Sequence, residues 1–194
     1  MDAADWDERY RSAGLLWSAD PNVFVKTRLG NRPPGRGVDL GCGEGRNAIW
    51  LAELGWEMVA VDFSGVALDR GRQRSGAVSF IEADVFAWQP SGLFDLVLIA
   101  YLQVGWERLH SLIRSATGWL APGAELFMIG HDQSNIEFGV GGPQVPEILW
   151  DVDRIVSALG GLEIVEAGVL RRPVEVENGV GHARDALVRA ARRF

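Results

Sequence analysis

A glycine-rich turn between a strand and a helix restricts the fold of this chain more than any other feature. Residues 37–40 are typical of a short strand, and residues 45–54 carry apolar side chains at helical spacing. Between them, glycine recurs at Gly41, Gly43 and Gly45. Glycine lets the backbone turn sharply and approach a ligand closely, and a helix N-terminus adds exposed N–H groups. The pattern predicts a strand–turn–helix unit that binds a ligand; a tight turn without a ligand is the alternative.

The rest of the chain alternates strands with helices. Such alternation implies a parallel sheet covered by helices on both faces. The last two strands have no helix between them, so we expect them to pair as an antiparallel hairpin. The fold class is therefore α/β, with a mostly parallel sheet that ends in an antiparallel hairpin. The expected strands are 37–40, 57–62, 78–81, 94–101, 124–130, 162–174 and 184–190, and the expected helices are 45–54, 65–74, 106–120 and 151–160.

Length and composition fit one domain that spans residues 1–194. Hydrophobic residues make up 47% of the 194 residues, which is enough apolar side chain to build a core. The formal net charge is −7, and a negative surface disfavours binding to nucleic acids and to anionic membranes. The single cysteine excludes an intramolecular disulfide and a cysteine-cluster metal site. An acidic N-terminus and the lack of a long apolar run lead us to expect a cytoplasmic location.

Two classes of ligand compete for the glycine turn. A dinucleotide-binding turn follows the pattern G-x-G-x-x-G, and this chain has Arg46 where the last glycine would stand. The carboxylate of Asp39, two residues before Gly41, would repel a pyrophosphate but suits a ligand with an ammonium group. S-adenosylmethionine carries an ammonium group, a carboxylate and a ribose, and it has no phosphate. The turn therefore favours S-adenosylmethionine, and a nicotinamide-dependent oxidoreductase is the less favoured class.

Four features resemble the motifs of one enzyme family. Residues 38–47 resemble motif I of the class I S-adenosylmethionine-dependent methyltransferases, and residues 94–101 resemble motif IV. Asp62 lies at the end of the second strand and resembles the acid that binds the ribose in that family. Asp84 lies at the end of the third strand and resembles the acid that accepts a hydrogen bond from the adenine amino group. The opening residues 6–10 are most similar to small methyltransferases of the tellurite-resistance and thiopurine type. The resemblance covers nearly the whole chain and implies the Rossmann-like, seven-stranded methyltransferase sheet.

The resemblance also implies S-adenosylmethionine as the co-substrate. Phe63 is expected to pack on its adenine, and Arg46 to reach its carboxylate. Residues 1–30 form an aromatic lead-in that is expected to act as a lid, in which Trp17 can attract the sulfonium through a cation–π contact. Cys42 is expected to pack in the turn rather than to act as a nucleophile, since no basic partner is evident. The expected donor-binding residues are Trp17, Asp39, Gly41, Cys42, Gly43, Arg46, Asp62, Phe63, Asp84, Val85 and Ala100.

The acceptor side is expected at the carboxyl end of the fifth strand, because ligands of open α/β sheets bind at that edge. His131 is the candidate base, with the adjacent Asp132 expected to orient its imidazole and Tyr101 expected to orient the acceptor. The polar, glycine-rich segment 133–148 follows directly and is expected to close over the acceptor. One His–Asp pair supplies too few ligands for a closed metal site, so no metal is expected.

The identity of the acceptor stays open at this stage. A small molecule is expected, because the predicted elements consume nearly all of the chain. A hydroxyl acceptor would need His131 as its base, a contribution of about 10²–10⁴-fold in rate, and the polar loop favours this class slightly. A thiolate or a chalcogen oxyanion would need no base. A protein that binds S-adenosylmethionine without transferring its methyl group is the alternative from another class, and the sequence does not indicate an oligomeric state.

Overall fold

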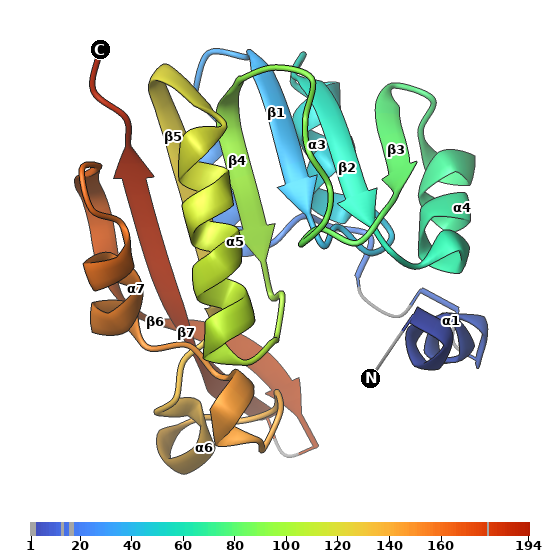
Figure 1. The fold of residues 1–194 in the computed structure, drawn as a ribbon. Helices are drawn as coiled ribbons and strands as arrows, with labels where there is room; N and C mark the ends of the chain where they lie inside the picture. Colours follow the sequence, from blue (N-terminus) through green and yellow to red (C-terminus); the bar gives the residue numbers. More distant parts are fainter. Residues whose placement is uncertain (1–2, 13, 16–17, 178) are drawn as a thin grey trace. The chain divides into compact units, whose positions relative to one another are not determined.

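The structure, a computed structural model, describes residues 3–12, 14–15, 18–177 and 179–194. Trp17, one of the expected donor-binding residues, lies outside them. The contacts of the chain divide it into two compact units, residues 1–98 and 99–194. Within the described residues, seven strands form one mixed sheet in the order β3-β2-β1-β4-β5-β7-β6 (Figure 1). The expected α/β class with a seven-stranded sheet is confirmed.

The first unit carries parallel strands and the helices around the glycine turn. β1 pairs in parallel with β2, and β2 pairs in parallel with β3. The helix α3 packs against β1 and β2, and α4 packs against β2 and β3 (Figure 1). The strands and helices predicted here agree with the structure to within one residue at each end. The elements are α1 (Ala3–Ser12), α2 (Val23–Leu29), β1 (Arg36–Leu40), α3 (Arg46–Glu53), β2 (Glu57–Asp62), α4 (Gly65–Arg74), β3 (Val78–Glu82) and β4 (Phe94–Ala100), whose last two residues belong to the second unit.

The second unit contains the antiparallel strands. β7 pairs antiparallel with β5 on one side and with β6 on the other, which confirms the expected C-terminal hairpin. The helix α7 contacts both β6 and β7 (Figure 1). The segment 133–148, expected as a loop, contains a short helix and a 3-10 turn. The elements are α5 (Trp106–Gly118), β5 (Leu120–His131), α6 (Asn135–Phe138), the 3-10 turn Pro146–Ile148, α7 (Val152–Ala158), β6 (Glu163–Val176) and β7 (Gly179–Ala191).

The start of β5 differs from the expectation. Pro122 and Gly123 were expected to separate a helix from a strand that begins at residue 124, but β5 already begins at Leu120. The reason is pairing with the end of the chain, since the amide of Gly123 donates to the carbonyl oxygen of Arg192 at 2.8 Å. A partner about 70 residues away thus overrides the local tendency of proline and glycine to interrupt a strand.

Buried apolar runs explain why the central strands are straightforward to predict. Leu96, Val97 and Leu98 of β4 are fully buried, as expected for a strand covered on both faces. In the second unit, the apolar side chains 126–129 of β5 are buried in the same way. None of the helices in the described ranges is long and apolar enough to cross a membrane.

Candidate functional site

The glycine turn is fixed to β2 by backbone hydrogen bonds. The amides of Gly41 and Cys42 both donate to the carbonyl oxygen of Val61, at 2.8 and 3.1 Å. Gly43 has a φ of +55°, in the left-handed region that side chains disfavour. A Cβ at this position would also lie 2.7 Å from the hydroxyl of Tyr10. Position 43 therefore requires glycine for its backbone angle and for its close neighbour.

Asp62 joins the end of β2 to the same turn. Its Oδ2 accepts a hydrogen bond from the amide of Gly43 at 2.8 Å, and its Oδ1 accepts from the amide of Ser64 at 2.9 Å. Burial raises the pKa of the Asp62 carboxyl, although the two amides act in the opposite direction. The carboxylate thus holds the glycine turn and the start of α4 in one arrangement, at the place where the sequence predicted a ribose-binding acid.

Asp39 is a buried carboxylate without a hydrogen-bond partner. Its side chain is 1% exposed, and within the described part of the chain neither carboxylate oxygen has a partner. Burial raises its pKa from 3.8 to about 7. The charge of Arg46 and the nearby backbone amide of Ala48 lower it, and the charge of Asp62 raises it. An unsatisfied buried carboxylate costs free energy that a cationic ligand group would recover. The residue therefore fits the ammonium group of S-adenosylmethionine.

The helix α1 lies against the residues that hold the glycine turn. The hydroxyl of Ser64 donates to Asp7 at 2.5 Å and also accepts from the amide of Ala67, which caps α4. Tyr10 is buried at 4% exposure, with its hydroxyl above Gly43. Sequence analysis missed Asp7 because nothing in its local pattern distinguishes it from a solvated acid, whereas Tyr10 lies in the aromatic lead-in that was expected to act as a lid.

Two arginines of α4 connect the lead-in to the glycine turn. Arg70 forms an ion pair at 3.0 Å with Glu44, which is 3% exposed, and donates to the carbonyl oxygen of Gly14. Arg74 donates to the carbonyl oxygen of Ala19 at 3.1 Å. The lead-in is therefore anchored by charge-assisted hydrogen bonds, which are stronger than neutral ones.

Three other expected donor-side residues lie at or beside the turn. Arg46 opens α3 and donates to the hydroxyl of Ser18 at 3.5 Å. Burial raises the pKa of the Cys42 thiol, and the nearby carboxylates raise it further, so it stays protonated at neutral pH. Phe63 follows Asp62 and is half-buried. Their predicted contacts with the donor stay predictions.

The remaining expected donor-binding residues, Asp84, Val85 and Ala100, follow strands β3 and β4 or end them. Asp84 is exposed, and its Oδ1 accepts from the amide of Phe86 at 3.0 Å. Val85, next to it, is buried at 4% exposure. Ala100 ends β4 and belongs to the second unit. The adenine-binding role of Asp84 stays a prediction.

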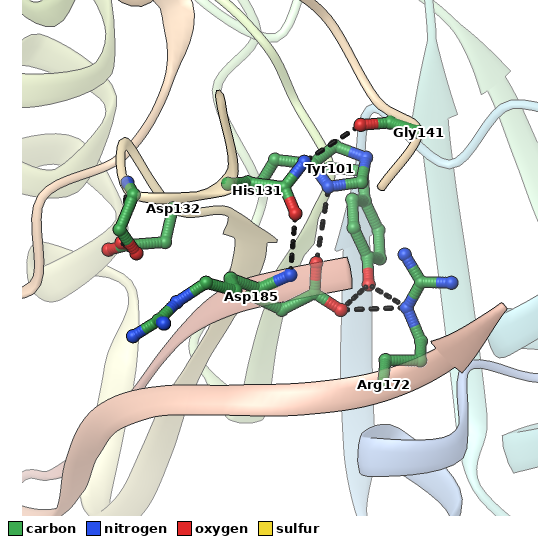
Figure 2. A network of polar contacts seen from close by, with 9 residues as sticks. Tyr101, His131, Asp132, Gly141, Arg172 and Asp185 are labelled. Carbon is green, nitrogen blue, oxygen red and sulfur yellow. Dashed lines mark hydrogen bonds and ion pairs between the residues drawn. The ribbon is translucent and has the colours of Figure 1, made fainter. Parts of the chain in front are cut away.

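In the second unit, the buried carboxylate of Asp185 contacts three polar side chains. His131 and Tyr101 were expected at the site, and Arg172 was not. Asp185 of β7 lies directly opposite His131 in the β5–β7 register, and its Oδ1 is 3.2 Å from Nδ1 of His131. The hydroxyl of Tyr101 donates to Oδ2 of Asp185 at 2.8 Å, and Nε of Arg172 donates to the same oxygen at 2.7 Å. Figure 2 shows these groups converging on Asp185. We call Tyr101, His131, Arg172 and Asp185 the acceptor-side cluster.

The expectation that Asp132 orients His131 is wrong. Consecutive residues of a strand point to opposite faces, and Asp132 points away from the imidazole (Figure 2). Its Oδ1 accepts from the amide of Ser134 at 2.9 Å and from the Ser134 hydroxyl. Asp132 therefore shapes the turn after β5, and Asp185 is the carboxylate beside the imidazole.

Backbone strain and tight packing mark the acceptor-side cluster. Tyr101 has a φ of +56°, which costs a non-glycine residue free energy and tends to occur at functional sites. Burial raises the pKa of its hydroxyl, and the charge of Asp185 raises it further, so the group stays a donor. Gly142, in the segment 133–148, lies against the imidazole, because a Cβ there would be 3.0 Å from three ring atoms of His131.

Charge in the cluster is balanced between Asp185 and Arg172. Asp185 is fully buried, and burial alone would raise its pKa. The contacts with His131, Arg172 and Tyr101 outweigh that effect, so its pKa is lowered and it is a carboxylate at neutral pH. In the described ranges, no group of three or more His, Cys, Asp or Glu side chains lies close enough together to hold a metal ion.

Comparison with known proteins gives consistent matches. Residues 38–123 match a family described as a methyltransferase domain. Thiocyanate methyltransferase 1 from Arabidopsis thaliana is 26% identical over 154 residues, which cover 74% of this chain and 66% of that protein. Probable thiol methyltransferase 2 from the same plant is 22% identical over 173 residues, which cover 80% of this chain and 72% of that protein. The match thus spans about two thirds of the length of the first of these relatives.

A solved structure agrees over the full chain. The N-methyltransferase NodS from Bradyrhizobium japonicum WM9, in complex with S-adenosyl-L-homocysteine, has a TM-score of 0.74 and 18% identity, and the match covers 100% of both chains. At this identity the likeness shows the fold. The domain match over residues 38–123, the relatives and the shared fold together support a class I S-adenosylmethionine-dependent methyltransferase.

Proposed function

We propose that the protein transfers the methyl group of S-adenosylmethionine to the thiol of a small molecule. The observation that carries the proposal is the imidazole of His131, whose Nδ1 faces the carboxylate of Asp185 at 3.2 Å. Within the part of the chain that the structure describes, no hydrogen bond reaches its Nε2. An imidazole held in this way can take a proton from an acceptor at Nε2. The thiocyanate and thiol methyltransferases among the relatives support a sulfur acceptor.

The acidity of the acceptor favours a thiol over a hydroxyl. A thiol has a pKa of about 8.5 and an imidazole about 6.5, so proton transfer between them costs about 3 kcal/mol. For a group as weakly acidic as water, with a pKa of about 15.7, the same transfer costs about 12 kcal/mol. We therefore propose a thiol acceptor in place of the hydroxyl acceptor that the sequence favoured slightly. A hydroxyl acceptor is the alternative that the experiment must exclude.

Each residue of the acceptor-side cluster has a role in this proposal. The co-substrate supplies a methyl group on a sulfonium, which is already activated for displacement. His131 accepts the thiol proton at Nε2 as the acceptor sulfur becomes a nucleophile. The Tyr101 hydroxyl and Arg172 are held by Asp185 and orient the acceptor. Positioning of this kind supplies much of the rate of a displacement reaction.

The donor side rests on the two carboxylates at the glycine turn. Asp39 has both oxygens buried and without a partner in the described residues, and it pairs with the ammonium group of the donor. Asp62 accepts two backbone amides and keeps further acceptor capacity for the ribose hydroxyls. The lead-in, residues 1–30, acts as the lid, and its described residues Asp7 and Tyr10 contact the residues that hold the turn. Residues 133–148 act as the acceptor loop.

Donor affinity is expected to rise with pH through about 7. Only the ionised form of Asp39 attracts an ammonium group, and its pKa is raised to about 7 in the folded protein. The ionised fraction is then about one tenth at pH 6 and about nine tenths at pH 8. The Kd should therefore be about tenfold higher at pH 6 than at pH 8. Calorimetry with S-adenosylmethionine measures both values. Asp39→Asn, which cannot ionise, should remove the difference, and equal wild-type affinities would contradict the role of Asp39.

A product screen with an isotopically labelled methyl donor tests the function itself. The panel contains small thiols, thiocyanate, alcohols and carboxylates, and mass spectrometry identifies the methylated atom. We expect S-methyl products from the thiols. O-methyl products alone would indicate a hydroxyl acceptor and contradict the proposal. Donor binding without any product would indicate a donor-binding protein without transfer activity.

A further inference from the structure

We propose that Asp185 is the positioning residue of the acceptor-side cluster, because its contacts hold the proton of the His131 imidazole on Nδ1 and leave Nε2 as the base. This inference rests on the proposed function for its catalytic meaning. Its structural content, the tautomer of His131, can be measured without turnover. Sequence analysis assigned no role to Asp185.

The two oxygens of Asp185 have different partners. Oδ2 accepts two hydrogen bonds, one from the Tyr101 hydroxyl at 2.8 Å and one from Nε of Arg172 at 2.7 Å. Oδ1 lies 3.2 Å from Nδ1 of His131, and within the described residues neither of these two buried atoms forms an aligned hydrogen bond. A carboxylate accepts hydrogen bonds and cannot donate them. Contact with Oδ1 therefore favours the tautomer in which Nδ1 carries the proton.

The network around Oδ2 fixes the orientation of the carboxylate. Nε of Arg172 also donates to the Tyr101 hydroxyl, at 3.2 Å, so that hydroxyl accepts from Arg172 and donates to Asp185. The three groups form a closed triangle in which each hydrogen has an acceptor (Figure 2). Rotation of the Asp185 carboxyl would break two of these bonds, so Oδ1 is held toward the imidazole.

Charge and burial make this arrangement persistent. Asp185 is fully buried, and Arg172 at 24% side-chain exposure supplies the compensating positive charge. The carboxylate therefore stays ionised without needing a positive imidazole as its partner. The ring is also packed, since Gly142 leaves no room for a side chain beside it and Tyr101 meets it edge-on with centroids 5.0 Å apart.

The substitution Asp185→Asn tests the tautomer directly. An asparagine has one oxygen and one NH₂ group, and the two donors at the Oδ2 position select the oxygen there. The NH₂ group is then directed at Nδ1 of His131, which must become an acceptor. The imidazole proton moves to Nε2, and the base is lost while the shape of the site is kept. Loss of the correct tautomer is expected to lower turnover by about 10²–10⁴-fold.

The experiment uses the full chain, labelled with ¹⁵N. The spectra are recorded at a pH of about 9, where a free imidazole is neutral. The chain has three histidines, so His110→Gln and His182→Gln assign the His131 signals in a long-range ¹H–¹⁵N spectrum. We expect the Nδ1–H tautomer in the wild type and the Nε2–H tautomer in Asp185→Asn. Calorimetry with S-adenosylmethionine checks that the variant keeps its donor affinity.

A matched control separates this effect from the loss of any buried carboxylate. Glu125 on β5 is also buried, at 2% exposure, and pairs with Arg189 at 2.7 Å. Glu125→Gln should leave the His131 tautomer and the turnover unchanged. A wild-type imidazole with its proton on Nε2 would overturn the inference even if no variant folded. Full activity of His131→Ala would instead contradict the proposed base, whatever the tautomer, so the two failures can be told apart.

Discussion

His131→Ala is expected to lower kcat for a thiol acceptor by about 10²–10⁴-fold and to change donor affinity by less than about twofold. The variant removes the imidazole that faces the buried carboxylate of Asp185. None of the contacts described at the glycine turn involves His131, so donor binding should survive. Steady-state kinetics with an acceptor from the product screen and calorimetry with S-adenosylmethionine give the two quantities.

The acidity of the acceptor provides an internal check on this result. A thiol whose pKa lies below the assay pH is already a thiolate and needs no base, so the loss of kcat should shrink toward unity across a series of increasingly acidic thiols. His110→Ala is the matched control, because His110 stacks on Trp106 in α5 with ring centroids 5.5 Å apart. Equal losses of turnover and donor binding in His131→Ala would indicate a structural histidine instead.

The parts of the fold that the sequence predicts well depend on local signals. Alternating glycines after an apolar strand predicted the turn, and the structure shows the positive φ angles that explain them at Gly41, Gly43 and Gly45. Unbroken apolar runs predicted the buried strands. The start of β5 was missed, because the pairing of Gly123 with Arg192 is not visible in the residues around Pro122.

The acceptor-side cluster shows where sequence reasoning reaches its limit. His131 and Tyr101 were found from their places at strand ends, but the carboxylate beside His131 was expected to be Asp132, its neighbour in the chain. The carboxylate that faces His131 belongs to Asp185, which reaches it through the β5–β7 register. A register depends on hairpin geometry and on which face is buried, so it is not specified by local sequence.

The arginines of strands β6 and β7 illustrate the same limit for charges. Arg172 and Arg189 look alike in the sequence, but Arg172 joins Asp185 in the acceptor-side cluster, whereas Arg189 pairs with Glu125 and Glu166. Composition therefore gives the net charge of the segment without indicating which arginine serves a site. The single domain, the cytoplasmic location and the roles of Asp84 and Phe63 stay predictions.

Asp62→Ala is expected to weaken donor binding by about 10–100-fold while the chain still folds. The carboxylate accepts the amides of Gly43 and Ser64 at 2.8 and 2.9 Å, and hydrogen bonds to a charged group contribute about 1.5–3 kcal/mol each. Removing it frees the glycine turn from β2 and removes the group proposed to bind the ribose. Calorimetry with S-adenosylmethionine measures the loss of affinity, and thermal unfolding measures the loss of stability.

Asp95→Ala is the matched control that separates a loss of donor binding from a general loss of stability. Asp95 also uses its carboxylate to accept a backbone amide of β1, that of Arg36 at 2.8 Å, but it lies at the opposite end of that strand from the glycine turn. If the carboxylate–amide bonds of this unit served stability alone, both variants would lower the melting temperature and neither would change the Kd. Selective loss of affinity in Asp62→Ala would assign donor binding to Asp62, because its carboxylate holds the turn that we propose contacts the donor, and that of Asp95 does not. Unchanged affinity in Asp62→Ala would remove Asp62 from the donor site and leave Asp39 and Asp84 as its candidate carboxylates.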